Sequence, residues 1–114
     1  MTNIVTERIE RALRILFLDY EESLAKSGIL LELLPNYVGV QLDPEVYFEG
    51  LEAHLKCNLR IEVMNPISLD EDTEEEISSL VMDWLRAKQV DLELHKVGVD
   101  PEIFDWVSVS VLRV

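Results

Sequence analysis

Residues 51–64 read LEAHLKCNLRIEVM, and apolar and polar residues alternate along almost the whole stretch. The odd positions, from Leu51 to Val63, are all apolar, and the even positions, from Glu52 to Glu62, are all polar. Because successive side chains of a strand point to opposite faces, the pattern predicts a strand with one face in a core and the other in water or against a polar partner. At 14 residues it exceeds the usual strand of about 5–6. So long a strand is typical of a projecting arm or of a sheet used in assembly.

A helix is predicted upstream of this strand, over residues 3–26. Apolar residues recur there at steps of three and four, which places them on one helical stripe: Ile9, Leu13, Leu16, Tyr20 and Leu24. Gly28 follows the predicted helix at the position where a C-terminal cap residue in the left-handed conformation is favoured. Residues 29–34 form an apolar connector before Pro35. Residues 37–42 then predict a short strand with a possible bulge at Gly39.

A second helix is predicted to begin within the acidic run DEDTEEE at residues 70–76. Thr73 and Glu76 have capping-box spacing, and the surrounding carboxylates suit the positive end of the helix dipole. The buried stripe is formed by Ile77, Leu80, Val81, Trp84 and Leu85. The acidic run lacks the spacing of a calcium loop, so we interpret it as the start of a helix.

Two further strands are predicted downstream. Val90, Leu92 and Leu94 alternate with polar residues, and residues 107–112 alternate valines with Ser108, Ser110 and Leu112. The predicted order over residues 1–114 is therefore α-β-β-α-β-β. This order indicates a single α+β domain, with two helices packed on a mostly antiparallel sheet that contains one long strand.

A short motif occurs twice, as DPEVY at residues 43–47 and as DPEIF at residues 100–104. Asp-Pro-Glu favours a turn or one helical turn. Either the chain contains a helix–strand–turn–strand unit twice, or a motif that favours turns recurs by chance. Four aromatic residues lie around the two motifs: Tyr47, Phe48, Phe104 and Trp106. We expect them to fill the core beneath the turns; the alternative is an exposed binding hot spot.

Composition bounds the class of protein. The chain has 114 residues, 48% of them hydrophobic and 29% charged, which is typical of a globular domain. Its net charge is −13, which disfavours direct binding to nucleic acid and suits solubility, a basic partner or a surface that repels nucleic acid. No apolar run is long enough for a membrane span, and no secretory segment is evident. The sequence therefore predicts a cytoplasmic protein.

Residues capable of catalysis or metal binding are sparse. Cys57 is the only cysteine and falls on the apolar side of the long strand, which predicts a buried core thiol. His54 and His95 have no metal-ligand spacing around them, and no phosphate loop or nucleophile elbow is present. We therefore predict no catalytic, cofactor-binding or metal-binding residues and no enzymatic activity.

The polar side of the long strand is the candidate interaction surface. Its residues are Glu52, His54, Lys56, Asn58, Arg60 and Glu62. These mixed charges could pair with another strand or another subunit, and the alternative is a solvated sheet face.

The layout of the chain resembles the tail-terminator, or tail-completion, proteins of long-tailed bacteriophages, in the style of the lambda U type. The likeness is strongest over residues 51–114. It rests on a leading helix, a short strand, a long strand that ends LRIEVMNP (59–66), an acid-started helix that contains DWL (83–85), and a closing strand WVSVSV (106–111). The resemblance implies a structural virion protein that forms a ring of six subunits on the finished tail tube and joins it to head-completion or neck proteins. It also implies that genome DNA passes through an acidic lumen.

The sequence leaves other functions open. The main alternative is a small acidic inhibitor, such as an immunity protein, an anti-CRISPR protein or another DNA mimic, that binds a basic nuclease surface. The third possibility is a cytosolic adaptor domain. If the chain is a tail terminator, it is located in the virion after assembly in the host cytoplasm, as a homo-oligomer without a cofactor.

Overall fold

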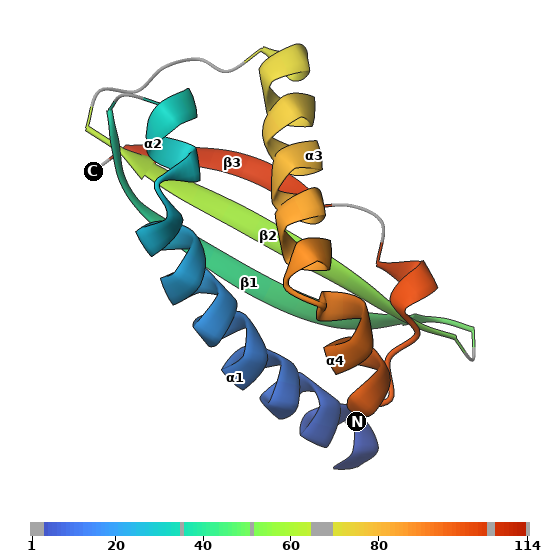
Figure 1. The fold of residues 1–114 in the computed structure, drawn as a ribbon. Helices are drawn as coiled ribbons and strands as arrows, with labels where there is room; N and C mark the ends of the chain where they lie inside the picture. The colour runs from blue at the N-terminus through green and yellow to red at the C-terminus, as the bar shows by residue number, and fades with distance from the viewer. Residues whose placement is uncertain (1–3, 35, 51, 65–69, 105–106, 114) are drawn as a thin grey trace.

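The computed structural model describes residues 4–34, 36–50, 52–64, 70–104 and 107–113. Figure 1 shows how the helices and strands are arranged. In chain order they are α1 (Ile4–Ser27), α2 (Ile29–Leu33), β1 (Tyr37–Glu49), β2 (Glu52–Val63), α3 (Glu71–Ala87), α4 (Val90–Lys96), the 3₁₀ turn η1 (Pro101–Ile103) and β3 (Val107–Arg113). The α+β class is confirmed, with the order α-β-β-α-β once short helices are set aside.

The predicted long strand is β2, and it is the central strand of the sheet. The strand order is β1-β2-β3, with β1 antiparallel to β2 and β3 parallel to it. The sheet is therefore mixed. A parallel pair needs a crossover connection, and the chain between β2 and β3, which contains α3, provides it. The odd residues of β2 from Leu55 to Val63 are buried, as the alternation predicts.

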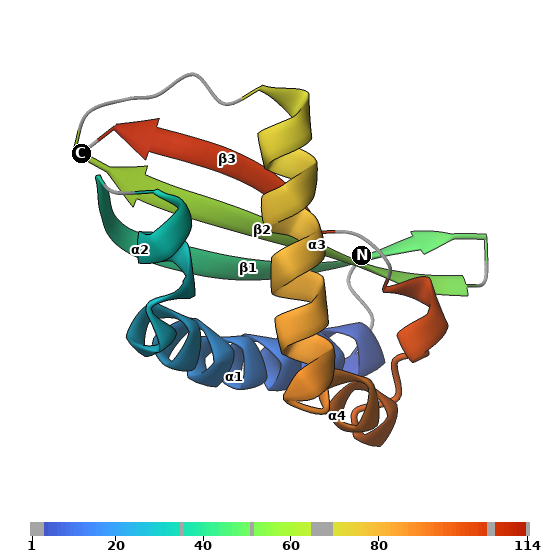
Figure 2. The same ribbon diagram turned by 45° about the horizontal axis from the view of Figure 1, so that its top comes forward.

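The helices lie on one face of the sheet, so the fold has two layers (Figures 1 and 2). The core lies between these layers. Its largest fully buried side chains include Phe17 and Leu24 of α1, Leu59 and Ile61 of β2, and Phe104, which follows η1. The rings of Phe17 and Phe104 meet edge to face with their centroids 6.1 Å apart, which ties the first helix to the segment before the last strand.

The strand β1 is much longer than predicted. It runs through the first Asp-Pro-Glu motif, where a turn was expected, and the chain reverses at Gly50 with φ 63° instead. Proline is tolerated in a strand at a sheet edge, where the missing N–H faces away from the ladder. The backbone N–H of Leu42 donates to Oε1 of Glu21 at 2.8 Å, so it points away from β2. By alternation the nitrogen of Pro44 lies on that same free edge.

The second Asp-Pro-Glu motif does form a turn, as predicted. Asp100 accepts a hydrogen bond from the backbone N–H of Glu102 at 3.0 Å, and residues 101–103 form η1. Since the first copy is extended and the second is turned, the two copies are not structurally equivalent. The sequence repeat is therefore a recurrence of residues and not of structure.

The predicted strand at residues 90–94 was wrong, because this segment is the helix α4. Val90 and Leu94 are buried while Leu92 is half exposed, and spacing of four places the first two on one side of a helix. Gln89, with φ 64°, separates α4 from α3. A segment of seven residues contains too few apolar positions to distinguish a period of two from a period of 3.6.

The predicted helix boundaries hold with small differences. The first helix is described from Ile4, and the predicted first residue, Asn3, lies outside the described residues. The helix ends one residue later than predicted, and Gly28 takes the left-handed conformation with φ 77°. The connector at residues 29–34 is largely the short helix α2, and the ladder shifts register between Tyr37 and Gly39, where a bulge was expected. The cap of α3 is Asp70, which accepts from the N–H of Thr73 at 2.7 Å, so the capping box from Thr73 to Glu76 was wrong.

Shortening Leu59 to alanine should destabilise the fold severely. The residue is fully buried in the central strand, and removal of such a side chain costs about 2–5 kcal/mol. The matched control is Arg60→Ala, one residue along on the exposed face, where we expect a loss of less than about 1 kcal/mol. Urea denaturation of the two variants measures both changes, and equal losses would contradict the assigned faces of β2.

Candidate functional site

The face of the sheet opposite the helices is the candidate site, and we call it the open face. The register brings together residues from three strands on this face: Gly39, Gln41, Asp43, Glu45 and Tyr47 of β1, His54, Lys56, Asn58, Arg60 and Glu62 of β2, and Ser108 and Ser110 of β3. Five of the six residues predicted from the sequence lie here. The backbone of the sixth residue, Glu52, belongs to β2, but its side chain lies outside the described part of the structure.

Sequence reasoning missed the contribution of β1 to the open face. Asp43 and Glu45 had been assigned to a turn, so their place beside Asn58 and Lys56 was not foreseen. The position of the two serines of β3 could be predicted from the sequence, since they alternate with valines that face the core. Which strand β3 would join depends on long-range pairing, which alternation alone does not reveal.

The charged groups on the open face are matched across neighbouring strands. Nη2 of Arg60 lies 3.4 Å from Oδ2 of Asp43, and both side chains are about half exposed. Glu45 is directly opposite Lys56 in the ladder, an arrangement that favours attraction between opposite charges. An exposed ion pair of this kind contributes only about 0–1 kcal/mol. The open face can therefore exchange its internal partners for those of another molecule at little cost to the fold.

A second contact links β3 to the open face. Oγ of Ser108 donates to Oδ1 of Asn58 at 2.7 Å and also lies 3.4 Å from the carbonyl oxygen of Cys57. This contact fixes the amide of Asn58 near the centre of the open face. The central part of the site is thus held in place by side-chain hydrogen bonds in addition to the backbone ladder.

The hairpin formed by β1 and β2 extends beyond the helical layer, as Figure 2 shows. Near its end, Tyr47 stacks on the ring of His54 with centroids 5.4 Å apart and an interplanar angle of 19°. Tyr47 is 41% exposed and Phe48 is 51% exposed, so the expectation that both fill the core was wrong. Phe104 is buried as expected, and Trp106 lies outside the described residues.

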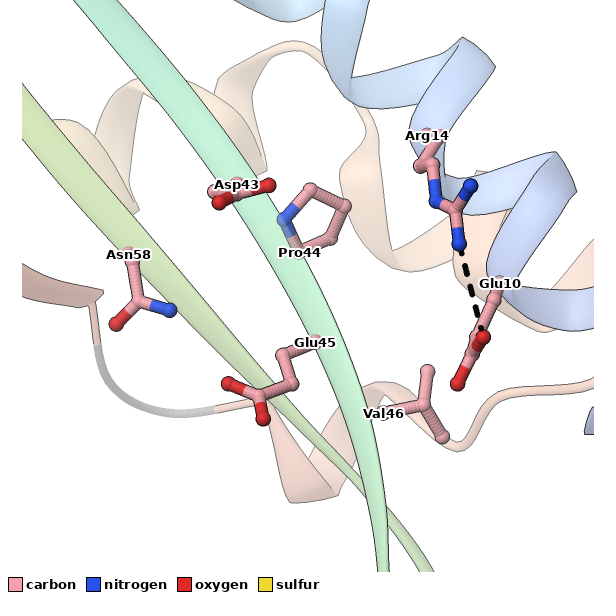
Figure 3. Close-up of a pocket in the computed structure, with 7 residues that line it drawn as sticks. All are labelled: Glu10, Arg14, Asp43, Pro44, Glu45, Val46 and Asn58. Carbon is pink, nitrogen blue, oxygen red and sulfur yellow. Dashed lines mark ion pairs between the residues drawn. The ribbon is translucent and has the colours of Figure 1, made fainter. Parts of the chain in front are cut away.

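A groove separates α1 from the free edge of β1. One part of it, with a volume of about 290 Å³, is drawn in Figure 3 and is lined by Glu10, Arg14, Asp43, Pro44, Glu45, Val46 and Asn58. Its wall on α1 includes the ion pair between Arg14 and Glu10, whose atoms are 3.8 Å apart. The neighbouring part, of about 340 Å³, adds Leu18, Glu21, Gln41 and Leu42. The lining of the two parts therefore combines apolar side chains with four carboxylates and a single cation, Arg14.

Cys57 and the two histidines do not form a reactive centre with one another. Cys57 is fully buried, and burial raises the pKa of its thiol to about 12. His54 belongs to the aromatic stack on the hairpin, while His95 is exposed on α4. Within the described ranges, no three His, Cys, Asp or Glu side chains come together as a metal site would require. The helices of that same part of the chain include none that is long and apolar enough to cross a membrane.

The chain was compared with known proteins. No protein-family model, no curated protein and no solved structure matches it.

The burial of Cys57 predicts how its thiol reacts and how stability depends on pH. At pH 8 a thiol reagent should label the native protein at least a thousandfold more slowly than the urea-unfolded chain, because only the thiolate reacts. Since the folded pKa is raised, this group stabilises the fold fully below about pH 9 and loses that contribution as the pH rises toward 12. Rapid labelling of the native protein would contradict the assignment of Cys57 to the core.

Proposed function

We propose that this chain is a non-enzymatic structural virion protein that caps the tail tube of a long-tailed bacteriophage as a ring, of six subunits if it follows the family it resembles, and joins the tube to head-completion or neck proteins. The observation that supports the proposal best is the open face, a polar surface on three strands that the described helices leave uncovered. In this proposal the chain acts in the virion, at the junction of tail and neck, after assembly in the host cytoplasm.

The chemistry of the open face suits contacts between subunits. Its described side chains include three carboxylates, Asp43, Glu45 and Glu62, against the two cations Lys56 and Arg60, so it is nearly balanced in charge. Two such surfaces can approach without the repulsion that a chain of net charge −13 would otherwise cause. The open face is therefore the part of the molecule best suited to meet another copy.

The acidity of the chain is concentrated in the helical layer. Five acidic residues are exposed around the start of α3, namely Asp70, Glu71, Asp72, Glu75 and Glu76. If the open face makes the subunit contacts, the helical layer stays accessible, and its negative charge would repel DNA that passes close to it. This division of charge agrees with a ring through which a genome moves.

The same acidic cluster supports the second candidate function. A monomer that presents these carboxylates could bind a basic nuclease surface, with fast association that depends strongly on salt. In that case the helical layer would be the interface, and the open face would be solvated. The two candidates thus assign binding to opposite layers of the fold, so surface substitutions can distinguish them.

Native mass measured over a wide concentration range, with electron microscopy of any large species, tests the proposed ring. We expect a closed oligomer at high concentration or on added tail tubes. A chain that stays monomeric under both conditions, yet binds a basic nuclease tightly, would contradict the proposal and favour the inhibitor.

Reversal of both cations of the open face should weaken assembly and leave the fold intact. The variant Lys56→Glu/Arg60→Glu replaces attraction to neighbouring carboxylates by repulsion, so we expect about tenfold or greater loss of oligomer affinity. The matched control is Lys26→Glu/Lys96→Glu in the helical layer, because each double reversal changes the net charge from −13 to −17. Circular dichroism verifies folding, and native mass reports assembly. Equal effects of the two variants would show that only total charge matters.

A further inference from the structure

The two edges of the sheet differ in whether another strand can be added to them. At the β1 edge the N–H of Leu42 is bonded to Glu21 at 2.8 Å, and Pro44 has no N–H to offer. Such features block edge strands, whose unpaired backbone groups would otherwise pair with another chain. The opposite edge strand, β3, contains no proline, and its register with β2 is regular from Val107 to Arg113.

The backbone groups of β2 divide between its two neighbouring strands by alternation. Because the N–H of Leu42 points away from β2, the groups of the next residue, Asp43, point toward β2 and face Asn58. The residues on either side of Asn58 are Cys57 and Leu59, and they therefore direct their N–H and C=O groups toward β3. This direction determines which groups of β3 are bonded within the sheet.

The valines of β3 direct their backbone groups to the free edge. In a parallel ladder a residue bonds to the two neighbours of its register partner, so the partner's own groups point away. The partners of the two β2 residues are Val107 and Val109, and Val111 follows by alternation. In agreement, the carbonyl of Val107 accepts a hydrogen bond from Oγ of Ser78 on α3 at 2.7 Å. Among the described residues, Val109 and Val111 have no hydrogen-bond partner at this edge.

The sequence of β3 suits a second copy of the same strand. None of the 23 acidic residues lies in residues 107–114, so two chains of net charge −13 can meet here without opposing carboxylates on the paired strands. The partly buried Val109 and Val111 face the helical layer, and Ser108 and Ser110 lie on the open face. An antiparallel copy of β3 repeats this division, with β-branched side chains beside each other on one face and hydroxyls on the other.

We propose that two copies of the chain pair their β3 strands antiparallel, about a two-fold axis beside Ser110, so that two three-stranded sheets join into one. Val109 of each copy then lies opposite Val111 of the other. Because each such pair exchanges both of its N–H···O bonds, the two pairs form about four backbone hydrogen bonds.

The surroundings of β3 favour this register over its neighbours. A seam centred on Val109 would use the carbonyl of Val107, which already accepts from Ser78. A seam centred on Val111 would place the charged residue Arg113 beside Val109. The helix α3 crosses the sheet near the start of β3, and the strand continues away from it (Figures 1 and 2). The middle of the strand is therefore the best place for the axis.

Pairing at this edge goes beyond the proposed function and does not compete with it. The two-fold axis is perpendicular to the sheet, so both open faces lie on one side of the joined sheet and both helical layers lie on the other. The charged residues of the open face stay uncovered and form one wider surface. The pairing holds whether or not the chain caps a tail tube.

Disulfide trapping with Ser110→Cys tests the seam directly. Residues opposite each other in a non-hydrogen-bonded pair have Cα atoms about 4.5 Å apart, which is within the range of a disulfide. We expect diamide to link two chains of this variant, since native Cys57 is buried. The matched control is Ser108→Cys on the same face of the same strand, because the register separates its two thiols by about 13 Å along the strands.

Labelling of the dilute protein by a thiol reagent corrects for the accessibility of each introduced cysteine. The proposal is overturned if the two variants cross-link equally after this correction, or if neither does.

Proline at position 111 gives an independent measurement. The N–H of Val111 points to the free edge, so Val111→Pro removes a donor of the seam and no ladder bond to β2, as Pro44 does at the β1 edge. The control Val111→Ala shortens the same side chain and keeps the N–H. We expect the proline variant to self-associate about tenfold or more weakly than the alanine variant, as measured by sedimentation velocity.

Circular dichroism verifies that both variants fold, and the Ser110 disulfide decides if the proline variant does not. Equal affinities of two folded variants would contradict the seam. A ring that assembles equally well from both variants would overturn this inference and leave the proposed function standing.

Discussion

The fold depends on the strict alternation of the central strand β2, which is hydrogen-bonded on both sides and can bury only one of its faces. Leu55, Leu59 and Ile61 require an apolar layer above them, and α1 and α3 provide it. The residues between them are polar, so no second layer of helices can cover the opposite face without burying charge. The two-layer architecture and the open face are thus two results of one sequence pattern.

The same constraint separates the electrostatic properties of the two layers. The ladder brings acids of β1 next to cations of β2, so the open face is nearly neutral, whereas the start of α3 concentrates carboxylates where the helix dipole stabilises them. A strongly acidic chain therefore contains one surface on which another copy can dock without repulsion.

Sequence patterns predicted the elements whose apolar period is long and unambiguous. Both long helices, the strand β2 and its buried Cys57 followed from periodicity, and five candidate residues of the open face followed from the same alternation. The errors arose where the local sequence is compatible with two different secondary structures. Pro44 was expected in a turn and lies in an edge strand, because the edge leaves its nitrogen free of the ladder. Residues 90–94 were expected as a strand, since a segment of five residues fits either a period of two or a period of 3.6. The exposure of Phe48 depends on where the helical layer ends, which no local pattern encodes.

Hydroxyl-radical footprinting of dilute and concentrated protein, with mass spectrometry of each oxidised side chain, tests whether copies of the chain meet through the open face while the helical layer stays free. We expect Tyr47, which lies on the open face, to become protected on assembly, while Leu31 and Leu92 on the helices stay reactive. Protection confined to Leu31, Leu92 and the surroundings of α3 would contradict it and place the interface on the acidic layer.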